Sequence, residues 1–174
     1  MKDEVLLLCQ INILFTKKLE RVVLVKILNI YVACALTYAS EDFKKQIEIL
    51  KEEIRNIDGV NLFDFMGVIS GTPQDVYKHD IHHCVENANL IIAEVSEPST
   101  GLGWELGKAV ESQKGTYVLA LARENVKVTR LVIGAVDPKR NPRYFFKIYN
   151  TFEELVSFCK EEIEDKKIIF NIHN

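Results

Sequence analysis

Cysteine is scarce in this chain, and its placement argues against a disulfide-bonded protein. Four cysteines are spread over 174 residues, and no two of them form a Cys-x-x-Cys pair. This spacing is typical of reduced thiols in a cytosolic protein rather than of a disulfide framework. Cys84 and Cys159 fall on helix faces that the sequence pattern assigns to the core. We therefore expect a cytoplasmic protein with reduced, structural cysteines.

Positive charge is not in excess either. The formal net charge is −3, with 22 Lys and Arg residues against 25 Asp and Glu residues. This balance gives no general reason to expect a nucleic acid as partner. Lys139, Arg140 and Arg143 lie close together in one loop, but a solvated turn explains them better than a binding patch.

Long hydrophobic runs are also lacking. The apolar run at residues 5–15 is too short to cross a bilayer. Residues 31–35, YVACA, look like a signal-cleavage or lipidation site, but charged residues upstream interrupt the hydrophobic core that a leader needs. These charges are Lys17, Lys18, Glu20, Arg21 and Lys26. We expect no membrane contact, and residues 1–26 to be an N-terminal extension or the product of a misassigned start.

What the chain does contain is enough apolar sequence for one compact domain, at 48% hydrophobic residues. We place this domain at residues 27–174. Strand-like segments alternate with amphipathic ones, which predicts a mainly parallel sheet covered by helices on both faces. The predicted strands are 28–36, 60–65, 90–95, 116–122 and 143–149. The predicted helices are about 40–58, 74–89, 103–113, 128–134 and 152–164.

Residues 91–109, IIAEVSEPSTGLGWELGKA, form the most informative segment. A strand ends in a loop rich in Ser, Pro and Gly, and the predicted helix that follows carries Glu105 in its first turn. Backbone N–H groups at the helix start and the Ser99 hydroxyl could bind an anion, and Gly101 and Gly103 would let it approach closely. The last glycine, Gly107, comes one residue too late for the dinucleotide fingerprint, so we reject dinucleotide binding.

Asp80 is a second carboxylate in an unusual setting. It shares one face of the helix predicted at 74–89 with apolar or aromatic residues, which are Tyr77, Ile81, Cys84, Val85 and Ala88. Burying an ionised carboxyl group in such a position costs roughly several kcal/mol of folding free energy, unless the group is paired or neutral. Either a structural partner satisfies it, or it lines a cleft and works there.

Histidines on the same helix raise the question of a metal. His79 and His83 are four residues apart, as helical zinc ligands often are. Both fall outside the apolar face, no third ligand is apparent, and Cys84 is predicted to point inward. We expect no metal ion and no cofactor.

Three stretches together carry a resemblance to a known family: IYVACA around Tyr31, YKHDI around Asp80, and AEVSEPSTGLGWELGKA at 93–109. They resemble the nucleoside 2-deoxyribosyltransferase superfamily, most closely its 2'-deoxynucleoside 5'-phosphate N-hydrolase branch. The resemblance runs from about residue 30 to about residue 152. It implies a flavodoxin-like or Rossmann-like α/β domain of three layers, with a mainly parallel five-stranded sheet. It also implies a homodimer with shared active sites.

The resemblance further implies roles for individual residues. Glu105 matches the glutamate that attacks C1' of the deoxyribose, Asp80 the acid near base and sugar, and Tyr31 a tyrosine that orients the nucleophile. Ser99, Gly101 and Gly103 match the loop that holds the 5' end of the nucleotide. Thr129 stands where the family often has a serine that reaches into the neighbouring subunit's site.

One loop departs from the family pattern. Relatives often carry a GSIRGG-like sequence after the first strand, where this chain has CALTYA at 34–39. Without the arginine and glycines, Thr37 or backbone N–H groups would have to hold a phosphate. Phe65 could stack on the base, although a core role is equally compatible with its position.

The implied function is hydrolysis of 2'-deoxynucleoside 5'-monophosphates to a free base and deoxyribose 5-phosphate through a glutamate nucleophile. The partner is thus a small deoxynucleoside or deoxynucleotide. Two alternatives stay open: a transferase that exchanges bases on deoxynucleosides, and a nucleotide sensor without catalysis.

Overall fold

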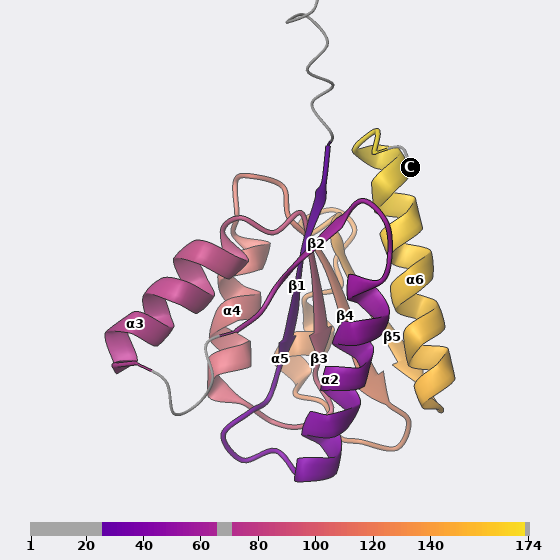
Figure 1. The fold of residues 1–174 in the computed structure, drawn as a ribbon. Helices are drawn as coiled ribbons and strands as arrows, with labels where there is room; N and C mark the ends of the chain where they lie inside the picture. The colour runs from indigo at the N-terminus through magenta and orange to yellow at the C-terminus, as the bar shows by residue number, and fades with distance from the viewer. Residues whose placement is uncertain (1–25, 66–70, 173–174) are drawn as a thin grey trace, which may run out of the picture.

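The structure is a computed structural model, which describes residues 26–65 and 71–172. The extension expected at residues 1–26 lies outside the described residues apart from Lys26. Five parallel strands form one sheet in the order β2-β1-β3-β4-β5 (Figure 1). The strands are β1 (Leu28–Cys34), β2 (Val60–Phe63), β3 (Leu90–Glu94), β4 (Tyr117–Arg123) and β5 (Tyr144–Tyr149). The predicted five-stranded, mainly parallel α/β sheet is confirmed.

Helices cover both faces of this sheet. One face carries α2 and α6, and the other carries the remaining helices (Figure 1). Their bounds are α2 (Glu41–Arg55), α3 (Pro73–Tyr77), the π-helix η1 (Lys78–Val85), α4 (Thr100–Val110), α5 (Arg130–Gly134) and α6 (Phe152–Ile169). In the described part of the chain, no helix combines the length and apolarity needed to cross a membrane.

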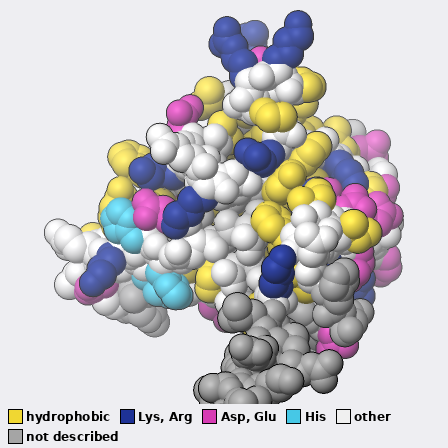
Figure 2. All heavy atoms as spheres, turned by 90° about the horizontal axis from the view of Figure 1, so that it is seen from above, with side chains coloured by type: hydrophobic (Ala, Val, Ile, Leu, Met, Phe, Trp, Pro, Cys, Tyr) yellow, Lys and Arg dark blue, Asp and Glu magenta, His cyan; other side chains and the backbone are white. Residues whose placement is uncertain are grey.

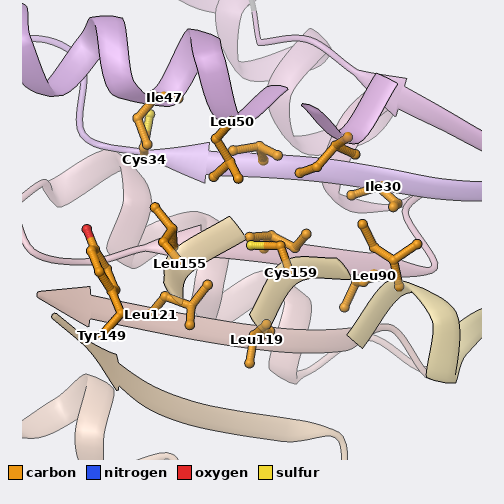
Figure 3. Close-up of a cluster of buried hydrophobic side chains, with 14 of the residues drawn as sticks. Ile30, Cys34, Ile47, Leu50, Leu90, Leu119, Leu121, Tyr149, Leu155 and Cys159 are labelled. Carbon is orange, nitrogen blue, oxygen red and sulfur yellow. The ribbon is translucent and has the colours of Figure 1, made fainter. Parts of the chain in front are cut away.

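Alternation along β1 divides its side chains between two hydrophobic cores. Ile30 and Cys34 pack toward α2 and α6, together with Leu50 and Cys159 (Figure 3). Tyr31 points the other way and joins the core under η1 and α4. The strand period of two thus delivers the Tyr31 side chain to the α4 face of the sheet. Cys84 and Cys159 are fully buried thiols, as predicted.

Two helices differ from the prediction in ways that affect the site. The helix expected at 74–89 is α-helical only over α3 and continues as η1. The helix expected at 103–113 begins at Thr100, capped by the Ser99 side chain. Glu105 is therefore in the second turn of α4, and the prediction of a first-turn glutamate beside the helix N-terminus was wrong. Tyr77 is exposed, so it does not belong to the buried face expected around Asp80.

The strand order reverses between β1 and β3, and in open α/β sheets ligands bind at the carboxyl ends of the strands at such a point. β1 leads into the loop that contains Thr37, and β3 leads into the loop that contains Ser99. The opposite end of the sheet faces the viewer in Figure 2. There, Lys and Arg side chains of the described residues lie in separate groups, several of them beside Asp or Glu side chains.

Candidate active site

Tyr31 and Glu105 meet although 74 residues separate them. The Tyr31 hydroxyl donates a hydrogen bond of 3.1 Å to Oε1 of Glu105. Tyr31 comes from the middle of β1 and is 1% exposed. Glu105 is half-buried on α4, which packs on the same side of the sheet. The hydrogen bond fixes one carboxylate oxygen and leaves the other oxygen for chemistry.

Burial changes the acidity of this pair. Loss of solvation raises the pKa of Glu105 to about 8, the negative charge of Asp80 adds to the increase, and the hydrogen bond from Tyr31 opposes it. Burial also raises the pKa of Tyr31 far above its usual range, so the phenol stays protonated and donates. A carboxyl group whose pKa lies near neutrality can serve in proton transfer or, once ionised, as a poorly solvated nucleophile.

Asp80 completes the group of carboxylates. It lies on η1 and is 9% exposed, and its Oδ1 is 3.0 Å from Nδ1 of His79. Its charge raises the pKa of both Tyr31 and Glu105, so the three side chains share one electrostatic environment. The structure therefore brings together all three residues of the expected catalytic group, each from a different element.

The residues expected to bind the 5' end lie at the start of α4. Ser99 caps this helix by accepting a hydrogen bond of 3.2 Å from the Leu102 N–H, so its hydroxyl hydrogen is still able to donate. Thr37, Ser99, Gly101 and Thr129 line one cavity at the carboxyl edge of the sheet. The first N–H groups of a helix have no partner within it and favour an anion.

The two glycines of this helix start leave open space around them. A Cβ atom on Gly101 would meet only the Ser99 hydroxyl, at 3.8 Å, and one on Gly103 would meet nothing within 4 Å. The fold itself therefore does not require glycine at either position. Gly103 lines a second, mainly apolar cavity between α4 and α5, next to the first. Both positions therefore leave open space beside the helix start.

The surroundings of Phe65 do not favour stacking of its ring on a base. The ammonium group of Lys51 lies 3.5 Å from the ring centroid, over one face. Lys51 is itself 2% exposed and pairs with Glu48 at 2.9 Å. The Phe65 ring also packs at the edge of both cores. These contacts favour the core alternative for Phe65.

A buried hydrogen-bond network under the Ser99 loop was missed by the sequence analysis. Glu94 is fully buried at the end of β3 and accepts 2.8 Å and 3.1 Å hydrogen bonds from the Tyr149 hydroxyl and the Ser96 N–H. The Ser96 hydroxyl also donates to Glu94 and accepts from the Arg123 N–H at 2.7 Å. Burial raises the pKa of Glu94. The signal was in the sequence: a glutamate inside the apolar run IIAEV.

We predict that Glu94→Ala destabilises the protein by about 2–4 kcal/mol, because Tyr149 and Ser96 lose a buried acceptor. Urea unfolding measures this change. The matched control is Glu97→Ala, which removes a partly exposed ion pair with Arg123 and should cost less than about 1 kcal/mol. Equal effects of the two substitutions would contradict a supporting role for Glu94.

Comparisons with known proteins agree with the resemblance in the sequence. No family model matches the chain. The "5-hydroxymethyl-dUMP N-hydrolase" of Rattus norvegicus is 31% identical over 41% of this chain and 43% of its own length. The "Putative 2'-deoxynucleoside 5'-phosphate N-hydrolase 1" of Thermofilum pendens is 35% identical over 41% of this chain and 50% of its own length. The chain thus spans about half the length of the curated relatives it matches.

These matches confirm the resemblance to this branch of the superfamily. The similarity to solved structures is weaker. The chain superposes on "Crystal structure of conserved protein from Enterococcus faecalis V583" with a TM-score of 0.49 and 14% identity, over 78% of this chain and 99% of that chain.

Proposed function

We propose that this protein hydrolyses the N-glycosidic bond of 2'-deoxynucleoside 5'-monophosphates and releases the free base and deoxyribose 5-phosphate. The hydrogen bond between Tyr31 and Glu105 beside Asp80 carries the proposal, because it holds one carboxylate in place next to a second, buried one. The names of the similar proteins support the same substrate class.

Two carboxylates suit the cleavage of this bond. As the bond from C1' to the base breaks, positive charge builds on the sugar, and ionised Glu105 attacks C1' to form a glycosyl ester. Asp80, whose negative charge raises the pKa of Glu105, takes a proton from the water molecule that attacks C1' and releases Glu105, and the departing base takes its proton from solvent. A 2-deoxy sugar favours this route, because no electron-withdrawing hydroxyl lies beside the reacting carbon.

The 5'-phosphate belongs, in this proposal, at the start of α4. The helix N-terminus offers backbone N–H groups and partial positive charge, and the Ser99 and Thr37 hydroxyls line the same cavity. These groups would bind the phosphate in place of the arginine that the loop 34–39 lacks.

Incubating the purified protein with each of the four deoxynucleoside monophosphates tests the proposal, with release of free base as the readout. We expect release from at least one of them and much slower release from the matching unphosphorylated deoxynucleoside. Base exchange on deoxynucleosides when a second free base is added would favour the transferase instead. Tight nucleotide binding without turnover would favour the sensor.

We also propose that two copies of the chain form a dimer through the region around α5. Leu131, at 86% exposed, is followed by Ile133 and Val136, each at 45%. These apolar side chains lie close to Thr129 and the two cavities beside α4. Covering them with a second copy would remove apolar surface from water at the edge of the site.

Mixing two inactive variants, Glu105→Ala and Thr129→Ala, tests whether the sites are shared. If Thr129 acts in the partner's site, each mixed dimer holds one intact site, and about a quarter of wild-type base release should return. Thr129 also caps α5 in its own chain and lines its own cavity. If mixing restores no base release while Thr129→Ser keeps the activity that Thr129→Ala loses, Thr129 acts in the site of its own chain instead.

A further inference from the structure

η1 brings together three side chains that bind transition metals. Nδ1 of His79 lies 3.0 Å from Oδ1 of Asp80 and 3.7 Å from Sγ of Cys84. One ligand atom from each residue lies within 4.8 Å of the other two. His79 is half-buried, whereas Asp80 and Cys84 are buried, so the group is open to solvent on the His79 side. Histidine side chains reach the surface at one side of the molecule in Figure 2.

The π-helical geometry of η1 creates this group. Residues five apart point roughly 140° apart around an α-helix, so His79 and Cys84 would face different sides. In a π-helix the N–H group of residue i+5 bonds to the carbonyl of residue i, which brings such residues onto one side. The hydrogen bond of 2.9 Å from the Glu86 N–H to the Ile81 carbonyl shows this pattern. The expectation that no third ligand joins a histidine here assumed an α-helix.

The distances from His79 to the other two ligand atoms suit tetrahedral coordination. With metal–nitrogen and metal–sulfur bonds of about 2.0 and 2.3 Å, neighbouring ligand atoms of a zinc site lie about 3.3–3.6 Å apart. The two distances from Nδ1 of His79, 3.0 Å and 3.7 Å, lie within a few tenths of an ångström of these values. The Asp80 oxygen and the Cys84 sulfur lie within 4.8 Å of each other, so they would approach by up to about 1 Å when the metal binds. Thiolate, imidazole and carboxylate together favour zinc over calcium or magnesium. Three protein ligands leave the fourth position for water.

We propose that His79, Asp80 and Cys84 form a zinc-binding site, and that bound zinc inhibits the enzyme. The Cys84 thiol donates to the Asp64 carbonyl at 3.6 Å. When the zinc–sulfur bond forms, the thiol proton passes to solvent. Zinc also takes a lone pair from Asp80 and prevents this carboxylate from taking a proton from water. The inhibitory half rests on the function proposed above, and the binding half does not.

Cobalt(II) titration of the whole chain tests binding without any substrate, because a thiolate ligand gives cobalt a strong charge-transfer absorption. We expect saturation at one cobalt ion per chain, and loss of the band on addition of zinc. Cys84→Ser should abolish the band, and His79→Gln should weaken binding about 10-fold or more. The matched controls are Cys159→Ser, another buried thiol, and His82→Gln, an exposed histidine of η1. Absence of the band, or its persistence in Cys84→Ser, would overturn the site.

Inhibition is measured separately. Zinc should slow base release by the wild type and leave Cys84→Ser unaffected, since Cys84 has no part in the proposed chemistry. Cobalt binding without any effect of zinc on turnover would overturn the inhibitory half. If no substrate is turned over at all, the proposed function fails, and the cobalt spectra still decide whether the metal site exists.

Discussion

Glu105→Gln is expected to lower kcat/KM for base release by about a thousand-fold or more, because an amide cannot attack C1' or stabilise the positive sugar. The substitution is close to isosteric, and the amide oxygen can still accept the hydrogen bond from Tyr31. We therefore expect the fold and nucleotide binding to persist. Steady-state kinetics and nucleotide binding, measured on the same preparation, separate the loss of chemistry from a loss of structure.

Glu153→Gln is the matched control, because Glu153 lies exposed in the first turn of α6, on the opposite face of the sheet from α4. It should keep near-wild-type kinetics. A Glu105→Gln protein that retains more than about a tenth of wild-type activity would remove Glu105 from the role of nucleophile. A loss of nucleotide binding in parallel with turnover would instead indicate that Glu105 mainly holds the substrate.

The sheet and its cores could be predicted because each strand carries its own signal. β1, β3 and β4 are short apolar runs bounded by turn residues, as fully buried parallel strands are. The burial of Asp80 followed from the spacing of its apolar neighbours. The apolar face of α2 and its N-cap residue Ser40 also follow rules that depend only on the local sequence.

The site was harder to predict, because its geometry depends on neighbours far along the chain. Only the adjacency of β1 and β3 places Tyr31 beside α4, and only the π-helical turn places Cys84 beside His79. The start of α4 was predicted three residues late, since Gly101 and Gly103 disfavour a helix. Packing of Leu102 and Leu106 into the core compensates for this cost.

The raised pKa of Glu105 predicts that stability and activity change in opposite directions with pH. The carboxyl group titrates near 4.5 in the unfolded chain and near 8 in the folded protein. Below about pH 4.5 both states bind the proton, and between these values only the folded state keeps it. The folded protein should therefore lose roughly 2–4 kcal/mol of stability as the pH rises from about 4.5 to about 8, after allowance for partial exposure.

Activity should rise over the upper part of the same range, because only ionised Glu105 attacks C1'. Unfolding free energies of wild type and Glu105→Gln, measured across pH, isolate the contribution of Glu105 to stability. As the pH rises, the stability of the Gln variant should increase relative to that of the wild type. Tyr31→Phe removes the hydrogen bond that lowers the pKa of Glu105. The pH of half-maximal activity and the pH at which stability stops falling should therefore both move upward. If these two pH values lie far apart, or if both lie near 4.5, Glu105 does not govern them. Burial of the glutamate thus lowers the stability of the folded state at the pH where the nucleophile becomes active.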